Sequence, residues 1–390
     1  MSRDLVLIAM SLFVWGTGEG MFIYFQSLYL QHWGADPVLI GSILGVMGIM
    51  MTIGQAPAGY LADRVGSRPV MWASWFLGAT ATVVMALANS MTLFVVGLLL
   101  YGLTSFVVAP MNSYITSVRG KWSVGRALTL VSALFNLGAV LGPILGGLLG
   151  DRLGIGAIYR ISAVLFVVST AIILFVRPAP KEEAHHTEAT DTGHLLRNTR
   201  YVGLLVLCFT VMFATYLPQP LTSNYLQNEQ GFSLSQIGQL GALGSLGNAL
   251  IMLLLGSLAA PVGFVVGQGL VAIFALIMWL GSGQIWFSIG YLFIGGYRLC
   301  RSMALALTRP LVRSKEIGLA YGLIETANAL AVAAAPGMAG LLYAASPVLV
   351  FQVALICIAL AAVISLFVLP RIEPVSAPAV ETQPLDEETL

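Results

Sequence analysis

Charged side chains are scarce in this chain of 390 residues. Only 9% of the residues are Asp, Glu, Lys or Arg, against about 25% in an average soluble domain. Hydrophobic residues make up 58% of the chain, and the mean hydropathy is +0.90. A water-soluble protein of this length cannot bury so much apolar surface, so the composition predicts an integral membrane protein. The formal net charge is only +1, which gives no sign of the basic patch of a nucleic-acid-binding protein.

Cysteine and histidine are also rare. The three cysteines lie inside apolar runs without metal-ligand spacing, so we predict that they are small core residues. Three of the four histidines lie in one polar segment and are predicted to be solvated. The chain has no nucleotide-binding glycine loop, metal cluster or nucleophile–base arrangement, so we expect no cofactor or metal and disfavour an enzyme.

Long apolar runs fill most of the chain. A helix needs ~20 residues to cross a hydrocarbon core of ~30 Å, and helices are expected because the backbone must satisfy its own hydrogen bonds in lipid. Twelve segments meet this requirement, near 5–31, 38–62, 70–89, 91–117, 124–150, 156–176, 201–226, 234–259, 262–282, 285–312, 318–344 and 347–369. The expected fold class is therefore an all-α membrane protein with twelve transmembrane helices.

One long polar stretch, from Arg177 to Arg200, interrupts the apolar runs. We predict a bundle of six helices over 1–177, a cytoplasmic linker over 178–200 and a second six-helix bundle over 201–370. The acidic, proline-bearing segment 371–390 is predicted to be a disordered cytoplasmic tail.

The positive charges predict the orientation. If the N-terminus is inside, most Lys and Arg residues fall on the cytoplasmic side, and only Arg152 and Arg160 fall outside. We therefore expect a multi-pass protein of the cell inner (plasma) membrane with both termini in the cytoplasm.

The sequence contains an internal duplication. Ile40 and Gly41 match Ile237 and Gly238 at an offset of 197 residues. Further matches occur at an offset of 193 residues, where Gly125, Pro143 and Gly147 correspond to Gly318, Pro336 and Gly340. Two similar halves related by a pseudo-two-fold axis along the membrane normal are a known transporter design, so the duplication predicts two pseudo-symmetric bundles.

A compact charged turn, Gly59 to Pro69, lies between the second and third apolar runs. A partly matching copy without charged residues recurs at Gly256 to Gly263. The turn resembles the cytoplasmic helix 2–3 signature of the major facilitator superfamily, which reads Gly, any, Leu, Ala, Asp, basic, any, Gly, any, basic. The resemblance extends over all twelve spans and implies transport by alternating access. It also implies a conformational switch in which Asp63 faces the N-terminus of the eleventh span, near Ile317 and Gly318. The residues assigned to this switch are Gly59, Asp63, Arg64, Gly66, Arg68 and Arg119.

A second motif lies in the fifth span. It resembles the glycine–proline motif of the superfamily's antiporters, chiefly the drug:proton exporters, although Thr129 stands where the family often has an earlier glycine. The small residues provide a smooth face for close helix packing, and the proline should bend the helix. The motif residues are Gly138, Gly142, Pro143, Gly146 and Gly147.

One position departs from the family pattern. Many proton-coupled members carry an Arg in the fourth span, four residues before a Gly, whereas this chain has Leu98 before Gly102. Coupling must then use other residues or be absent.

Four ionisable residues lie within predicted spans, where such groups are functional candidates. Glu19 lies slightly beyond the midplane in the first span, whereas Arg298 and Glu325 are both expected about 10 Å above the cytoplasmic edge. We predict that Arg298 and Glu325 form an ion pair and that Arg301 extends toward the cytoplasm.

Glu19 is flanked by Gly16, Gly18 and Gly20, and the first half has no basic residue at its depth. Burial without a counter-charge favours the protonated carboxyl, which can then exchange a proton for a cationic substrate. Some multidrug exporters of the superfamily carry an acidic residue in this span. A protonated Glu bonded to a backbone carbonyl is the structural alternative.

Aromatic and polar side chains are predicted to line the cavity between the halves. They are Trp15, Phe22, Tyr24, Gln26, Asn136, Tyr216, Gln219 and Asn328. Pro218 and Pro220 should break the seventh span near its outer end.

The leading prediction is a monomeric secondary transporter that exports small amphipathic or cationic compounds in exchange for protons, with the lipid bilayer as its environment. One alternative is transport of an anion or polar metabolite held by Arg298 and Arg301. Another is a lipid flippase on the same fold.

Overall fold

The computed structural model describes residues 2–55, 64–178, 195, 197–313 and 316–372. Within these residues the regular secondary structure is entirely helical. The elements are α1 (Arg3–Ile23), α2 (Gln26–His32), α3 (Pro37–Gln55), α5 (Ser67–Ala86), α6 (Met91–Leu103), η1 (Thr104–Val107), α7 (Val108–Val118), α8 (Val124–Leu153), α9 (Ile155–Leu174), α11 (Thr199–Tyr216), α12 (Thr222–Asn228), α13 (Leu234–Leu255), α14 (Ala260–Leu280), α15 (Gly283–Phe293), α16 (Gly296–Thr308), η2 (Arg309–Leu311), α17 (Ile317–Ala345) and α18 (Leu349–Ile372).

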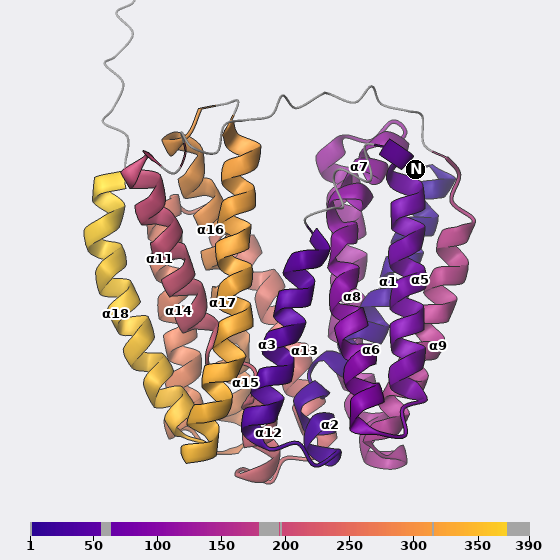
Figure 1. Cartoon of the computed structure of the whole chain (residues 1–390), viewed down its shortest axis with the longest axis horizontal. Coiled ribbons are helices and arrows are strands. Elements are labelled where there is room, and N and C mark those ends of the chain that lie inside the picture. Colours follow the sequence, from indigo (N-terminus) through magenta and orange to yellow (C-terminus); the bar gives the residue numbers. More distant parts are fainter. Residues whose placement is uncertain (1, 56–63, 179–194, 196, 314–315, 373–390) are drawn as a thin grey trace, which may run out of the picture.

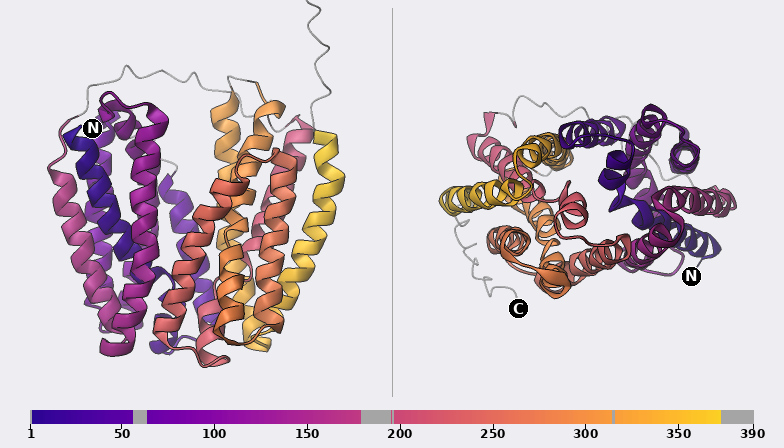
Figure 2. Two further views of the ribbon diagram at one scale, coloured as in Figure 1. Left: turned by 180° about the vertical axis from the view of Figure 1, so that it is seen from behind. Right: turned by 90° about the horizontal axis from the view of Figure 1, so that it is seen from below.

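The helices form two groups that stand side by side (Figure 1). The first group comprises α1 to α9, in which α1 packs on α8 and α9, and α5 packs on α6 and α9. The second group comprises α11 to α18, in which α14 packs on α16 and α18, and α11 packs on α17. Figure 2 shows the same two groups from behind and from below.

Buried polar side chains join the helices of the first group. The indole Nε1 of Trp75 donates to Ser11 Oγ at 2.8 Å and to Ser169 Oγ at 3.0 Å. These three residues are buried and belong to α5, α1 and α9. Buried hydroxyl and indole groups need such partners where no water reaches them, so this triad stabilises the interior of the group.

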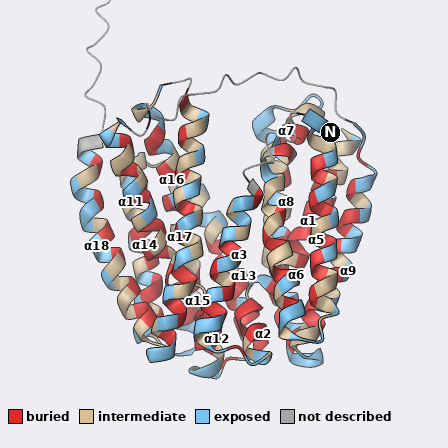
Figure 3. Ribbon diagram, in the orientation of Figure 1, coloured by how far each residue is buried: buried red, intermediate tan, exposed pale blue. Residues whose placement is uncertain are grey.

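Large apolar side chains cover the outer surface of the molecule. Leu253 and Ile285 are each 78% exposed, and Phe367 is 65% exposed. Figure 3 shows the exposed residues along the outward sides of the helices and the buried residues along the inward sides. Lipid tails, unlike water, accommodate such a surface, which agrees with the membrane protein predicted from composition.

The N-terminus and the end of α9 mark one end of the bundle, which we call the terminal face. Ser2 Oγ donates to the carbonyl of Val118, and the Arg177 N–H donates to Asp4 Oδ1 at 3.1 Å. At this face the two groups are separated in Figure 1. Within the described residues, the contacts between the groups lie toward the other end, which we call the closed face.

Two helix pairs and two short helices make the contact between the groups. The pairs are α3 with α17 and α8 with α13, and the short helices are α2 and α12. We call this contact region the seam. Its helices run close together because glycines face backbone carbonyls across it.

Ten helices of the described chain are long and apolar enough to cross a membrane, and the bent pair 91–107 and 110–118 adds an eleventh span if it counts as one. The prediction of twelve continuous spans is therefore only partly met. The predicted span 285–312 is divided into α15 and α16 at Ile294 and Gly295, and each part is too short to cross alone.

Two of the predicted spans end in short separate helices. The break predicted at Pro218 and Pro220 is confirmed, because α11 ends at Tyr216 and α12 begins at Thr222. The first span is broken at the equivalent place, between α1 and α2, although no proline is present there. The predicted disordered tail starts slightly too early, since α18 continues to Ile372, and residues 373–390 lie outside the described chain.

Candidate functional site

Glu19 lies on α1, four residues before its end, and is partly exposed. Its carboxyl has two polar neighbours in the first group, the hydroxyl of Tyr101 and the indole N–H of Trp15. The ring of Trp15 lies against Phe166, with the ring centroids 4.4 Å apart. The acid therefore sits at the edge of an aromatic cluster whose polar atoms are directed toward it.

Arg298 lies on α16 of the second group and is exposed. Within the described chain its guanidinium makes no hydrogen bond or ion pair. Its charge acts on Glu19, Tyr24 and Tyr297, of which Glu19 and Tyr24 belong to the first group. Arg298 is thus a cation of the second group whose charge reaches Glu19 of the first group, without forming an ion pair with it in the described chain.

The predicted ion pair between Arg298 and Glu325 is wrong. Glu325 instead pairs with Arg301, whose Nη2 lies 2.6 Å from Glu325 Oε2 and whose Nε donates to the same oxygen at 3.0 Å. The prediction that Arg301 extends toward the cytoplasm is therefore also wrong, because its guanidinium is held by Glu325.

The depths of the three side chains explain this correction. Arg301 lies seven residues before the end of α16, about 10 Å along the axis, and Glu325 lies eight residues after the start of α17, about 12 Å. Arg298 lies ten residues before the end of α16, about 15 Å, so Arg301 is the arginine nearer in depth to Glu325.

The tyrosines around Arg298 form hydrogen bonds that the sequence did not reveal. Tyr297 donates its hydroxyl to Asn328 Oδ1 at 2.7 Å, and the ring of Tyr216 lies 5.4 Å from that of Tyr297. Across the gap, Tyr24 Oη and Ser245 Oγ lie 3.2 Å apart. Tyr216, Asn328 and Tyr24 were predicted to line the cavity. Tyr216 and Asn328 contact Tyr297, the neighbour of Arg298 in the chain, and Tyr24 lies within the influence of the Arg298 charge.

The other predicted lining residues differ in their surroundings. Phe22 is fully buried among Tyr101, Tyr159 and Phe166, and therefore belongs to the interior of the first group rather than to an open wall. Trp15 is only 7% exposed.

Amide side chains among the predicted lining residues also vary. Asn136 and Gln219 donate to carbonyls of their own helical turns, those of Ser132 and Thr215. Gln26 is 6% exposed, and its Nε2 has no partner in the described chain. The amides therefore do not form a single shared binding surface.

The predicted switch is described only in part. Gly59 and Asp63 lie outside the described residues. Gly66 precedes α5 with φ of +88°, a conformation that favours glycine. The guanidinium of Arg68 stacks over the ring of Trp72 at 4.0 Å, and Arg119 Nη1 donates to the carbonyl of Thr116. Arg64 is exposed at the start of this segment.

The glycines of α8 lie in close contact with two different helices. Gly138, Gly142 and Gly146 lie directly against backbone carbonyls of α1, so a Cβ at any of them would clash. Gly147 faces α13 of the second group instead, against the carbonyl of Leu234. Pro143 lies inside α8 without ending it.

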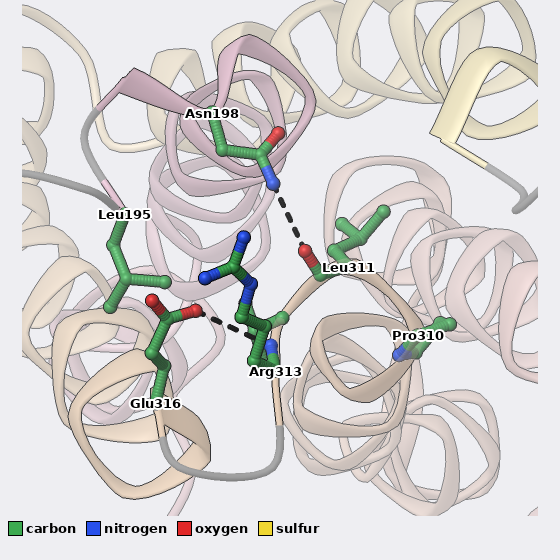
Figure 4. Close-up of a pocket in the computed structure, with 7 residues that line it drawn as sticks. Leu195, Asn198, Pro310, Leu311, Arg313 and Glu316 are labelled. Atoms are coloured by element: carbon green, nitrogen blue, oxygen red, sulfur yellow. Dashed lines mark hydrogen bonds between the residues drawn. The ribbon is translucent and has the colours of Figure 1, made fainter.

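A pocket lies at the terminal face of the second group, away from the predicted site. It has a volume of about 290 Å³ and is lined by Leu195, Asn198, Pro310, Leu311, Val312, Arg313 and Glu316. Figure 4 shows the side chain of Arg313 directed into it. Asn198 Nδ2 donates to the carbonyl of Leu311 at 3.0 Å, and Leu195 is only 1% exposed. The hydrogen bond from Asn198 therefore joins the start of α11 to η2, which follows α16.

A smaller cavity of about 190 Å³ lies in the seam. Around it, Asn224 Nδ2 donates to Gln31 Oε1 at 2.6 Å and Gln31 Nε2 donates to Asn228 Oδ1 at 3.1 Å. Gln31 and Asn228 are 197 residues apart. The same offset that revealed the duplication would have identified this pair, which the sequence analysis missed.

Groups of three or more His, Cys, Asp or Glu side chains that could hold a metal ion do not occur in the described part of the chain. The three cysteines are free thiols, and two of them are buried.

Comparisons with known proteins place the chain among transporters. The family model of the Major Facilitator Superfamily matches residues 8–300. The inner membrane transport protein YajR of Escherichia coli (strain K12) is 24% identical over 174 residues, which are 42% of this chain and 38% of YajR. The multidrug resistance protein MdtG of Salmonella paratyphi A is 26% identical over 240 residues, 59% of each chain. The matches thus span less than two thirds of these relatives.

Solved structures share the fold over nearly the whole chain. A crystal structure of a mutant form of the nucleoside transporter NupG has a TM-score of 0.83 at 13% identity and covers 95% of this chain and 100% of its own. A bacterial homologue of the human lysosomal transporter Spinster has a TM-score of 0.73 at 13% identity and covers 96% and 98%. At such identities the likeness shows the fold alone. These relatives are transport and resistance proteins rather than enzymes.

Proposed function

Because the chain belongs to the Major Facilitator Superfamily, we propose that it is an alternating-access transporter that exports small amphipathic or cationic compounds in exchange for protons. The observation that carries this proposal is the position of Glu19, an acid on a membrane-spanning helix at the edge of an aromatic cluster. Such a carboxyl can hold either a proton or a cation. The similarity to MdtG supports the choice of a resistance-type substrate.

The proposal includes the arrangement in the membrane. Residues 1–177 and 201–370 would be the two bundles that rock against each other, joined by the linker 178–200. The terminal face would be cytoplasmic, as the distribution of Lys and Arg predicts, and both termini with it. The conformation described above, closed at the other face, would then be open to the cytoplasm.

A Glu19→Gln variant tests the coupling. In everted vesicles, it should lose uptake driven by an imposed proton gradient, because the amide cannot release a proton. Unchanged gradient-driven uptake would remove Glu19 from the coupling.

A second candidate function has its own observation. Arg298 is exposed and unpaired within the described chain, and its charge reaches Glu19 of the first group. This favours an anionic or polar substrate, whereas the pairing of Arg301 with Glu325 withdraws Arg301 from that role.

Ligand stabilisation separates the two candidates. Purified protein and an Arg298→Gln variant are heated with cationic amphiphiles, or with organic anions and polar metabolites, at two pH values. Stabilisation by anions that disappears in Arg298→Gln would establish the second candidate. Stabilisation by cations that disappears in Glu19→Gln would establish the first.

A further inference from the structure

The seam makes each of its main contacts twice. Gly41 lies against the carbonyl of Pro336 on α17, and its repeat equivalent Gly238 lies against the carbonyl of Pro143 on α8. The duplication is thus present in the contacts themselves, since the two prolines are also repeat equivalents.

The same holds for the second pair of glycines. Gly340 lies against the carbonyl of Pro37, and Gly147 lies against that of Leu234. Pro37 and Leu234 are 197 residues apart and each is the first residue of its helix. Each crossing is therefore built from a glycine, a carbonyl and the first turn of a helix.

Asp151 breaks this symmetry. Its Oδ1 accepts from the N–H of Leu234 at 3.0 Å, and its Oδ2 accepts from the N–H of Ser235 at 2.8 Å. At the other crossing the position equivalent to Asp151 is Ala344, and the position equivalent to Leu234 is Pro37, which has no N–H to donate. Only one of the two crossings has a carboxylate that bridges the groups.

Both hydrogen bonds join the last turn of α8 to the first turn of α13. The first N–H groups of a helix have no partner within it, and the positive end of the helix dipole lies there. A carboxylate from the opposite group satisfies two of these donors and meets a favourable charge. When the closed face opens, α8 and α13 must separate, and both bonds are lost.

We propose that Asp151 is a latch of the closed face, a positioning residue that biases the transporter toward the state closed on this side. The proposal rests on the alternating access proposed above. Asp151 lies on the first group, and the helix N-terminus that it binds lies on the second group. The resemblance implies the same arrangement at the terminal face, where Asp63 of the first group would face the N-terminus of α17 of the second group. The two acids would therefore stabilise opposite states.

The rate at which a buried thiol reacts reports the opening of the closed face. Leu221 is 1% exposed and lines the seam cavity, so a Leu221→Cys reporter in a Cys357→Ala background should react only when this face opens. A membrane-impermeant maleimide is added from that side, and denatured protein gives the intrinsic rate. Asp151→Asn should raise the relative rate about threefold or more, since the charge at the helix N-terminus is lost.

Asp36→Asn is the matched control. Asp36 lies on the same face and accepts from the N–H of Leu39 at 2.8 Å, so it caps a helix of its own group and does not cross the seam. This variant should leave the reporter rate unchanged. An equal acceleration by Asp36→Asn and Asp151→Asn would overturn the latch.

A donor variant provides an independent measurement. Leu234→Pro introduces the residue found at the equivalent position of the other crossing, where proline is tolerated at the start of a helix. It removes one donor to Asp151, so it should accelerate labelling in the parent protein and add little in the Asp151→Asn background. Additive effects would show that Asp151 does not act through this bond. The reporter needs no substrate, so loss of transport in Glu19→Gln and failure of the latch are separate results.

Discussion

Arg298 and Arg301 are three residues apart on α16, yet their surroundings are opposite. Arg301 forms a bidentate pair with Glu325, whereas Arg298 is exposed and unpaired within the described chain. A helix turns its side chains by about 100° per residue, so three residues move a side chain about one sixth of a turn around the axis and about 4.5 Å along it. That displacement decides which arginine is structural and which remains available.

Glu325→Gln should therefore destabilise the protein. The side chains of Arg301 and Glu325 are 46% and 26% exposed, so solvent screens the pair and the expected loss is about 1 kcal/mol rather than the larger cost of a buried pair. Thermal unfolding in detergent measures it. Arg298→Gln is the control and should unfold at the parent temperature; an equal loss in both variants would contradict the assignment.

For individual side chains, the sequence identified the ionisable residues within the spans, but it did not predict which of them form an ion pair. Glu19, Arg298, Arg301 and Glu325 could be found because charge is rare in apolar runs. The partner of Glu325 could not be predicted, because it depends on how α16 and α17 are rotated about their axes, which hydropathy does not record. Asp151 was missed because an acid beside a loop looks solvated in the sequence.

Among the helices, the glycines divide into those that hold one group together and those that hold the two groups to each other. Gly142 lies against α1, whereas Gly238 lies against α8 across the seam. Replacing either adds a methyl group where a carbonyl already lies. The consequence should differ, because the first contact lies within one group, whereas the second must break in each cycle of the proposed alternating access.

Gly238→Ala should open the closed face and accelerate labelling of the Leu221→Cys reporter. Gly142→Ala should instead lower the unfolding temperature and change labelling little. Gly322→Ala is the matched control, since it lies on α17 with no atom within 4 Å of the added Cβ. Its helix propensity should even stabilise the protein by up to about 1 kcal/mol. Faster labelling in Gly322→Ala than in Gly238→Ala would refute this division.

Most helices could be predicted from hydropathy alone, because ~20 apolar residues have few alternatives in lipid. The breaks within spans could be predicted only where a proline indicates them, as at Pro218 and Pro220. The break between α1 and α2, and that between α15 and α16, depend on packing against neighbouring helices, which hydropathy does not record.

For the whole molecule, the seam amides lie where the two repeats meet. Gln31 and Asn228 are repeat equivalents that bond to each other, and Asn224 Nδ2 donates to the carbonyl of Ser27, its own equivalent, at 3.3 Å. Residues that contact their own repeat equivalents lie on or beside the pseudo-two-fold axis. The axis could be predicted from the duplication. The sequence did not show at which face of the molecule the two groups are in contact.

A cleavable cross-link between Gln31→Cys and Asn228→Cys should hold the closed face shut and stop transport. Reductant should restore activity, since the link alone prevents the groups from separating. Either single-cysteine variant treated with the same reagent serves as the control. Full transport by completely cross-linked protein would show that this face need not open.

The paired crossings of the seam also bear on leakage. Gly41 with Pro336 and Gly238 with Pro143 lie on opposite sides of the axis, so a tilt of one group against the other must strain both contacts together. Rigid, close-packed interfaces change between discrete arrangements rather than deform by degrees. A half-open seam, through which ions could pass without substrate, is therefore disfavoured in the proposed cycle. The duplicated glycines would then limit ion leakage as well as let the two groups approach closely.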